Sequence, residues 1–387
     1  MNFREFLNGS GIVFADGAMG TSLQSAGLKP GEIPETWSVK KPDVIRSVHA
    51  AYFDAGSDFV LANTFGANRV KYHGEENLED VVSASITLAR EASRGARGRF
   101  VALDVGPTGK LLKPSGDFEF DGAYDAFAEL VTLGASAGAD LIAIETMGDA
   151  YELKAAVLAA KENSSLPVLA TVALGEDGKL LTGADVETIA AILEGLRVDA
   201  VGLNCGLGPD LMLPYVERLA AATNLPIFVK PNAGLPKLVD GETRFLVSSE
   251  EFAANVVRLV RAGARIVGGC CGTTSGHIAA VKAALANEII PPRPVSGKRA
   301  VVTSGVRSVE IPFDDSIVIG ERINPTGKKK LREAYKSGDT AYILREAVSQ
   351  VDAGSHILDV NAGVPGIDEA AALEATVEAI QGVVDIP

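Results

Sequence analysis

A glycine-marked junction recurs along the chain, and it constrains the fold more than any other feature. Four times an amphipathic stretch ends in Ala-Gly and a short apolar run follows, at Ala55-Gly56, Ala137-Gly138, Ala262-Gly263 and Ala353-Gly354. A glycine just past a helix tolerates the left-handed conformation that ends the helix. A continuous apolar run is typical of a buried parallel strand. The repeat therefore predicts helices alternating with parallel strands.

Short apolar runs with this flanking occur eight times in the first 290 residues. The predicted strands are Ile12–Ala15, Phe59–Ala62, Phe100–Leu103, Leu141–Ile144, Val168–Val172, Ala200–Leu203, Ile227–Val229 and Ile266–Val267. The predicted helices are Val44–Ala55, Val81–Ser93, Tyr124–Ala137, Ala150–Lys161, Val186–Leu196, Leu211–Ala222, Glu250–Ala262 and Ser275–Ala286. Eight such pairs have the count and length of an α/β fold of the (β/α)8 TIM barrel type. A doubly wound open sheet is the alternative, because strand count alone does not prove closure.

A second, shorter α/β pattern follows the first. Residues 1–288 are expected to form the barrel, and the proline-rich stretch 289–315 is expected to be a linker. The predicted elements of the last part, residues 316–387, are a strand at Ile317–Ile319, a loop at Gly320–Gly327, a helix at Leu331–Ala353, a strand at Ile357–Val360 and a helix at Glu369–Val383. Because two strands and two helices cannot close a barrel, we expect an incomplete second α/β barrel.

Composition and charge exclude several classes of function. Fifty acidic against 36 basic residues give a formal charge of −14, and the one lysine run is Lys328-Lys329-Lys330, so no nucleic-acid partner is expected. No apolar run is long enough to span a membrane, and the chain does not begin like a secretory signal. Three cysteines are too few for a disulfide framework. We expect a soluble, cytoplasmic protein that acts on small molecules.

All three cysteines follow predicted strands. Cys205 comes directly after the sixth strand, and Cys270 and Cys271 follow the eighth. In a TIM barrel the active site is built from the loops after the strands. Three thiols at one rim match a catalytic zinc site, because structural zinc sites usually have four protein ligands. The alternative is that each cysteine simply fills the core. His277 is the nearest histidine and is expected to lie at a helix start instead.

Polar residues follow other predicted strands. Asp16, Asp104 and Glu145 come at strand ends, where each could be a site carboxylate, a helix cap or a loop brace. Asn232 precedes a glycine and could equally be a turn residue. These residues are candidates for the same rim as the cysteines.

Several of these motifs, taken together, resemble those of a known protein family. The segments Asp16–Thr21, Asn63–Gly66, Glu145-Thr146, Asn204-Cys205 and Gly268–Thr274 resemble the homocysteine S-methyltransferase family of zinc-dependent barrels. The resemblance covers about residues 10–286. It implies that homocysteine is a substrate, that a methyl donor is the second partner, and that Cys205, Cys270 and Cys271 are the zinc ligands. The sulfur of homocysteine would take the open position on the metal.

The resemblance also implies roles for residues around the amino-acid end of homocysteine. Glu145 would hold the substrate ammonium, and Asp16 would help to orient this end of the molecule. The backbone N–H groups around Gly17-Ala18 and Thr64 would receive the substrate carboxylate. Asn232 would offer the metal a displaceable oxygen when substrate is absent.

The second unit carries a further resemblance. The segments Gly320–Gly327 and Leu358–Gly363 resemble the start of the pterin-binding barrel of the cobalamin-dependent methionine synthases. The resemblance implies methylcobalamin as the methyl donor, recharged from 5-methyltetrahydrofolate in the complete enzyme. The implied pterin contacts are Glu321, Asn324, Asp359 and Asn361. Turn residues and helix caps are the alternative interpretation of these side chains.

Two other functions stay open at this point. One is a stand-alone homocysteine methyltransferase that takes its methyl group from S-methylmethionine or betaine. The other is a non-catalytic module that binds homocysteine or zinc, in which a fourth protein ligand closes the metal site.

Overall fold

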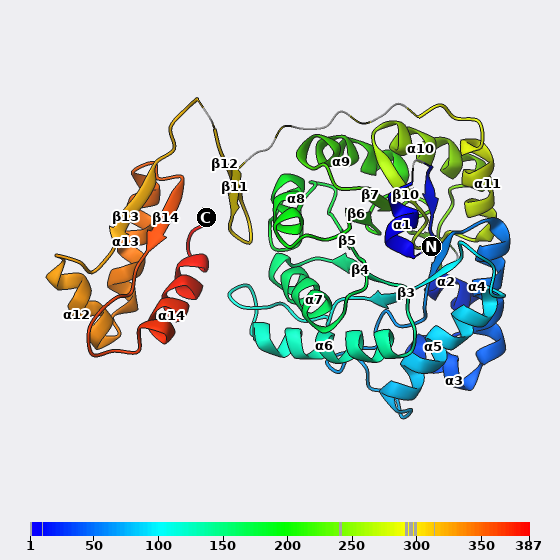
Figure 1. Ribbon diagram of the computed structural model, residues 1–387, viewed down its shortest axis with the longest axis horizontal. Helices are drawn as coiled ribbons and strands as arrows, with labels where there is room; N and C mark the ends of the chain where they lie inside the picture. Colours follow the sequence, from blue (N-terminus) through cyan, green and yellow to red (C-terminus); the bar gives the residue numbers. More distant parts are fainter. Residues whose placement is uncertain are drawn as a thin grey trace.

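The first three quarters of the chain form an eight-stranded parallel sheet surrounded by helices (Figure 1). The computed structural model describes residues 2–9, 11–239, 242–290, 293, 297, 300–312 and 314–387. The sheet comprises β1 (Val13–Phe14), β2 (Phe59–Leu61), β3 (Phe100–Val105), β4 (Leu141–Met147), β5 (Val168–Val172), β6 (Ala200–Asn204), β7 (Ile227–Lys230) and β10 (Ala264–Val267). All eight predicted strands are therefore present, with bounds shifted by a few residues.

The order of the strands confirms the TIM barrel over the doubly wound sheet. Neighbours run β1-β10-β7-β6-β5-β4-β3-β2, which follows chain order without the reversal that a doubly wound sheet requires. The two end strands are joined by hydrogen bonds around Asp58, whose amide donates to the Phe14 carbonyl oxygen at 2.7 Å. The amide of Leu61 in β2 donates to the Asp16 carboxylate just after β1 at 2.8 Å. The sheet is thereby nearly closed into a barrel.

Helices follow the strands on the outside of the barrel. They are α4 (Pro42–Ala55), α5 (Leu78–Ala92), α6 (Phe120–Ser136), α7 (Ala150–Asn163), α8 (Val186–Gly195), α9 (Pro209–Ala222), α10 (Ser249–Arg261) and α11 (Ser275–Leu285). Shorter elements lie in the connections, namely α2 (Gly20–Ser25), η1 (Pro34–Thr36), α3 (Trp37–Lys40), β8 (Lys237–Val239) and β9 (Glu242–Arg244). Gly56 ends α4 with a φ of 106°, as the glycine pattern predicted.

The amino-terminal end of the barrel is closed by a short helix. In α1 (Phe3–Leu7) the ring of Phe3 packs edge-on against Phe59 and Phe100, at centroid distances of 5.4 and 5.3 Å. Phe59 and Phe100 are the first residues of β2 and β3. Because this end is filled with apolar side chains, the opposite end is left for a functional site.

In the rest of the chain, the structure differs from several of the sequence predictions. Part of the predicted linker forms a hairpin of β11 (Ala300–Thr303) and β12 (Ser308–Ile311). The first strand of the last part is β13 (Ile319–Ile323), so it includes residues predicted as loop; its polar, exposed Glu321-Arg322 obscured it. The other elements are α12 (Lys329–Ser337), α13 (Thr340–Asp352), β14 (Ile357–Val360) and α14 (Glu369–Gln381).

The single helix predicted at Leu331–Ala353 is wrong. Gly338 ends α12 in the left-handed conformation, with a φ of 70°, and the Asp339 side chain accepts a hydrogen bond from the Tyr342 amide to begin α13. β13 and β14 pair in parallel as a two-stranded sheet, and no second barrel is seen in the described residues. The division at residues 288 and 315 into separate domains stays a prediction.

Among the residues that the structure describes, no helix has the length and apolar character needed to cross a membrane.

Candidate metal and substrate site

Three cysteine thiols converge at the carboxyl end of the barrel strands. Cys205 directly follows β6, and Cys270 and Cys271 lie in the loop after β10. Their Sγ atoms all lie within 4.8 Å of one another, and those of Cys205 and Cys271 are 3.9 Å apart. Across the described ranges, this is the one group of cysteine, histidine or acidic side chains with such metal-like spacing. Thiolates at this spacing could hold a thiophilic ion such as zinc.

The backbone around the thiols is fixed by the neighbouring strand β7. The amide of Cys205 donates to the Lys230 carbonyl oxygen at 3.0 Å, and the amide of Cys270 donates to the Pro231 carbonyl oxygen at 2.8 Å. Cys205 has a φ of 56°, which is strained for a residue with a side chain. Such strain persists only where the surroundings impose it, so the direction of the Cys205 side chain is fixed by its neighbours.

Asn204 connects three strands to the thiol group, and sequence reasoning gave it no role of its own. Its Oδ1 accepts hydrogen bonds from the Thr146 amide and the Thr171 hydroxyl, both at 2.8 Å. Its Nδ2 donates to the Thr146 hydroxyl at 2.7 Å and contacts the Cys270 sulfur at 4.0 Å. The Asn204 side chain is fully buried, and both its oxygen and its nitrogen make hydrogen bonds. It therefore helps to orient the Cys270 side chain that it contacts.

The thiols also influence one another's ionisation. Hydrogen bonds from Cys270 and then Cys271 lower the pKa of the Cys205 thiol. Hydrogen bonds with Cys205 and Cys271 raise the pKa of Cys270, and the bond with Cys205 raises the pKa of Cys271 to about 11. One thiolate supported by two thiols is the state these contacts favour in the absence of a metal ion, whose charge would ionise the others.

Asn232 is placed as the sequence suggested, just after β7. It is buried, its side chain hydrogen-bonds to Cys205, and its Oδ1 has no hydrogen-bond partner among the described residues. A buried oxygen without a partner costs free energy unless a ligand satisfies it. The position next to Cys205 fits an oxygen that a metal could use.

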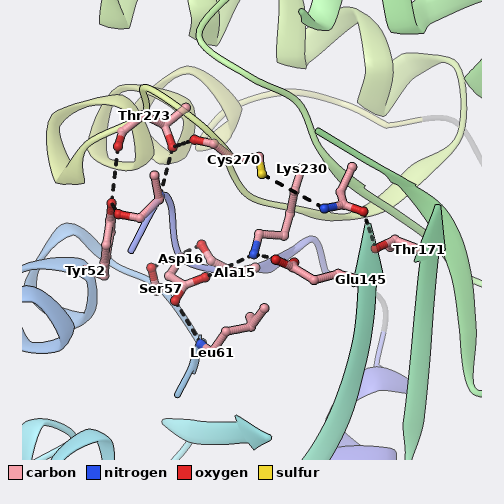
Figure 2. A network of polar contacts seen from close by, with 12 residues as sticks. Ala15, Asp16, Tyr52, Ser57, Leu61, Glu145, Thr171, Lys230, Cys270 and Thr273 are labelled. Carbon is pink, nitrogen blue, oxygen red and sulfur yellow. Dashed lines mark hydrogen bonds and ion pairs between the residues drawn. The ribbon is translucent and has the colours of Figure 1, made fainter. Parts of the chain in front are cut away.

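Carboxylates and one lysine line the same cavity as the thiols, and Figure 2 shows Asp16, Glu145 and Lys230 together with Cys270. Lys230, at the end of β7, is 2.8 Å from Glu145 Oε2 and 3.7 Å from Asp16 Oδ1. Burial raises the pKa of Asp16 to about 7, against the opposing effect of Lys230. Burial, followed by the charge of Glu145, raises the pKa of Asp104. Burial alone would lower the pKa of Lys230, but Glu145 and Asp16 raise it above its usual value.

These groups line one cavity of about 210 Å³. Its walls include the three cysteines, the four charged residues just described, and the backbone from Gly17 to Thr21. Sequence reasoning missed Lys230, although a charged residue directly after the apolar run Ile227–Val229 was a usable signal. It also missed Glu35, whose Oε1 accepts a hydrogen bond from the Gly66 amide at 2.6 Å. Nothing in the local sequence pattern marks Glu35.

Two of the backbone amides that were predicted to bind the substrate carboxylate already donate hydrogen bonds within the protein. Ala18 lines the cavity, but its amide donates to the Thr273 hydroxyl at 3.2 Å. Thr64 does not line the cavity: its amide donates to the Ala62 carbonyl oxygen at 2.7 Å, and its hydroxyl bonds to the backbone of Asp104. Gly17 lies on the cavity wall. The structure thus brings together most, but not all, of the predicted site residues.

His277 is at a helix start, as expected, and both of its ring nitrogens are used there. Its Nδ1 lies 3.0 Å from the Thr274 hydroxyl, and its Nε2 lies 3.1 Å from the Val247 carbonyl oxygen. A fourth metal ligand from this histidine would require breaking these contacts.

The four candidate pterin contacts lie on two paired strands of the last part of the chain. Glu321 is in β13 and Asn324 follows it, while Asp359 is in β14 and Asn361 follows it. Asn324 Oδ1 accepts from the Thr326 amide at 3.0 Å, and Asn361 Oδ1 accepts from the Gly363 amide at 2.7 Å, as in turns. The structure brings the four residues to one edge, where Glu321, Asp359 and Asn361 are exposed.

Comparison with known proteins identifies the barrel and its relatives. Residues 13–285 match the family model described as homocysteine S-methyltransferase. Methionine synthase of Mycobacterium tuberculosis (strain ATCC 25618 / H37Rv) is 35% identical over 384 residues, covering 94% of this chain and 32% of the relative. Methionine synthase of Mycobacterium leprae (strain TN) is 33% identical, covering 97% of this chain and 33% of the relative. The chain spans about a third of the length of these curated relatives.

Solved structures give the same assignment for the barrel. The metallated form of the homocysteine methyltransferase MmuM from Escherichia coli is 26% identical, with a TM-score of 0.61. The match covers 73% of this chain and 99% of that chain. The apo form of the same protein matches with a TM-score of 0.60.

Proposed function

Because the chain belongs to the homocysteine S-methyltransferase family and is thus a methyltransferase, we propose that it transfers a methyl group to the sulfur of homocysteine, giving methionine. The observation that carries this proposal is the group of three thiols within 4.8 Å at one end of a cavity whose other wall is charged. A ligand with a sulfur at one end and an amino-acid group at the other matches that division.

Zinc is the metal that this donor set fits. Cys205, Cys270 and Cys271 would hold it, and the unpartnered Oδ1 of Asn232 is a further oxygen beside them. Three protein thiolates without a fourth fixed ligand are typical of a catalytic rather than a structural site. Bound there, zinc would keep the substrate sulfur in its nucleophilic thiolate form at neutral pH.

The chain's own residues would orient the substrate. Asp16 and Glu145 are buried acceptors for the amino-acid end, and Gly17 and Ala18 form the adjacent wall. Thr64 supports this wall through the backbone of Asp104. Holding both ends of the substrate would leave its sulfur facing the methyl donor, and such fixed orientation lowers the barrier to transfer.

The proposed methyl donor is methylcobalamin, recharged from 5-methyltetrahydrofolate in a longer, cytoplasmic protein. The methionine synthase relatives support this choice because their similarity extends over 94% of the chain and so beyond the barrel. Under this proposal Glu321, Asn324, Asp359 and Asn361 would begin a pterin site. Betaine and S-methylmethionine are the alternative donors.

A donor comparison tests the proposal. The zinc-loaded chain is incubated with homocysteine and, separately, with free methylcobalamin, S-methylmethionine or betaine, and methionine is quantified. We expect methionine from methylcobalamin, with zinc near one equivalent per chain. Methionine from betaine or S-methylmethionine alone would replace the proposed donor. A chain that binds zinc but neither binds nor methylates homocysteine would instead be a binding module, contrary to the proposal.

A further inference from the structure

Asn204, the last residue of β6, is a fully buried amide to which the proposed function gives no role. An amide side chain has two acceptor lone pairs and two N–H groups. Its Oδ1 accepts from the Thr146 amide and the Thr171 hydroxyl, both at 2.8 Å, and its Nδ2 donates to the Thr146 hydroxyl at 2.7 Å. One N–H group remains, and the sulfur of Cys270 lies 4.0 Å from Nδ2.

The orientation of this amide is fixed by its partners. A backbone N–H can only donate, so the atom that faces the Thr146 amide must be the oxygen of Asn204. A flipped amide would place one N–H group against another and leave buried donors without acceptors, which costs free energy. Nδ2 must therefore be the atom that faces Cys270.

Two strained backbone positions lie directly beside Asn204. Thr146 has a φ of 64° and Cys205 a φ of 56°, and such values are uncommon for residues with a side chain. Thr146 follows Glu145 and makes two hydrogen bonds to the amide, while Cys205 follows Asn204 directly. Strained positions persist only where the surroundings over-determine them. One side chain thus holds the backbone both beside the thiols and beside the charged wall of the cavity.

The N–H group that faces Cys270 has an electrostatic consequence for a metal-loaded site. Three thiolates around one divalent ion leave a net negative charge, and a fourth thiolate from a substrate adds to it. A hydrogen bond to a metal-bound sulfur withdraws electron density and offsets part of that charge, as outer partners of metal ligands commonly do. Asn204 offers this N–H to Cys270, whereas the Asn232 side chain hydrogen-bonds to Cys205.

We propose that Asn204 is a positioning residue of the thiol site, whose remaining N–H offsets charge at Cys270 and so favours binding of a fourth, substrate thiolate. Its other three hydrogen bonds keep Thr146 in the strained conformation that places Glu145. This inference rests on the proposed function and adds a residue to it. The amide connects the part of the site that receives the sulfur to the part that receives the amino-acid end.

Cobalt(II) in place of zinc tests the role of the N–H, because its sulfur-to-metal charge-transfer band reports the electron density on the thiolates. Asn204→Ala should shift this band to longer wavelength and weaken zinc binding by about 10-fold to 100-fold, the usual cost of losing an outer partner. Thr171→Val also removes a hydrogen bond of Asn204 but leaves the N–H in place, so the band should not move. Asn68→Ala is the matched control, since Asn68 is equally buried but bonds to the backbone of Lys71 and Pro107.

A double variant tests the role of the strained backbone. Glycine adopts a positive φ without steric cost, so Thr146→Gly should make the backbone beside Glu145 independent of the amide. Asn204→Ala with Thr146→Gly should bind homocysteine more tightly than Asn204→Ala alone, measured by calorimetry on the zinc-loaded chain, while the cobalt band stays shifted. No gain in affinity would overturn the role in strain. A band that returns to the parent position would assign the shift to the backbone and overturn the role of the N–H.

The outcomes separate this inference from the proposed function. Asn204→Ala with the band and the zinc affinity of the parent chain would overturn the inference while leaving homocysteine methylation in place. A parent chain that loads zinc but does not bind homocysteine would contradict the proposed function, and the role of Asn204 in substrate binding with it. Asn204→Ser, whose short side chain fits the same space, replaces the alanine variant if circular dichroism shows that variant unfolded, and the same band shift is expected.

Discussion

The barrel and the C-terminal unit of residues 316–387 are built from the same alternation of helix and strand, yet their strands differ in burial. Every residue of β5 in the barrel is buried, whereas β13 in the C-terminal unit buries only Gly320 and Ile323. Each barrel strand has neighbours in a nearly closed sheet, whereas β13 and β14, among the described residues, form strand pairs only with each other. The comparison shows that the local sequence pattern determines where helices and strands form. Whether the loops after the strands surround a cavity depends on closure of the sheet.

The same difference separates the two candidate sites. The thiols and carboxylates at the ends of the barrel strands share one cavity of about 210 Å³. The polar residues after β13 and β14 mainly stabilise their own turns and face solvent. We therefore expect changes in the barrel to have larger effects than the same kind of change in the C-terminal unit.

The largest effect is expected from loss of a thiol. Cys270→Ala should lower zinc affinity by more than about 100-fold, since removing a ligand should exceed the loss seen when an outer partner is removed. Methyl transfer should fall to background. Metal analysis and a methionine assay measure both, and Cys205→Ala and Cys271→Ala should behave alike. Full zinc content in any of the three variants would contradict the assigned ligand set.

A leucine pair tests the difference in burial directly. Leu169 in β5 is fully buried, and Leu358 in β14 is only partly buried. Leu169→Ala should lower the free energy of unfolding by about 2–5 kcal/mol, because it leaves a cavity in a packed core. Leu358→Ala should cost about 1 kcal/mol. Urea unfolding of the full chain measures both, and equal costs would show that the two strands are buried alike.

A pH-dependent effect is expected from His49 in α4. Burial lowers its pKa from 6.5 to about 3. Between these values the unfolded chain binds a proton that the folded chain does not, so stability is lost as the pH falls from 6.5 towards 3. His49→Leu should reduce this loss, as measured by thermal unfolding at pH 7 and pH 4.5. The matched change His356→Leu, at an exposed histidine of the C-terminal unit, should leave the pH dependence in place.

The fold was predictable where the pattern is local. The strand ranges and the rim position of Cys205, Cys270 and Cys271 follow from apolar runs and glycines, because those features act within a few residues. The break between α12 and α13 depends on the conformation that Gly338 adopts, which helical periodicity does not reveal.

The pairings inside the cavity were not predictable in the same way. Lys230 and Glu145 lie 85 residues apart in the chain, and Asn204 reaches Thr146 across 58 residues. Such contacts exist only once the sheet has closed, so no window of sequence contains them. The resemblance supplied Glu145 and Asp16 but not the lysine that pairs with them.

The most direct test of the central claim is zinc X-ray absorption on the full chain before and after homocysteine is added. We predict three sulfur neighbours from the cysteines together with a lighter atom, and a fourth sulfur in place of that lighter atom when homocysteine binds. An unchanged spectrum at saturating homocysteine, confirmed by calorimetry, would contradict the claim that the three cysteines form a substrate-activating site.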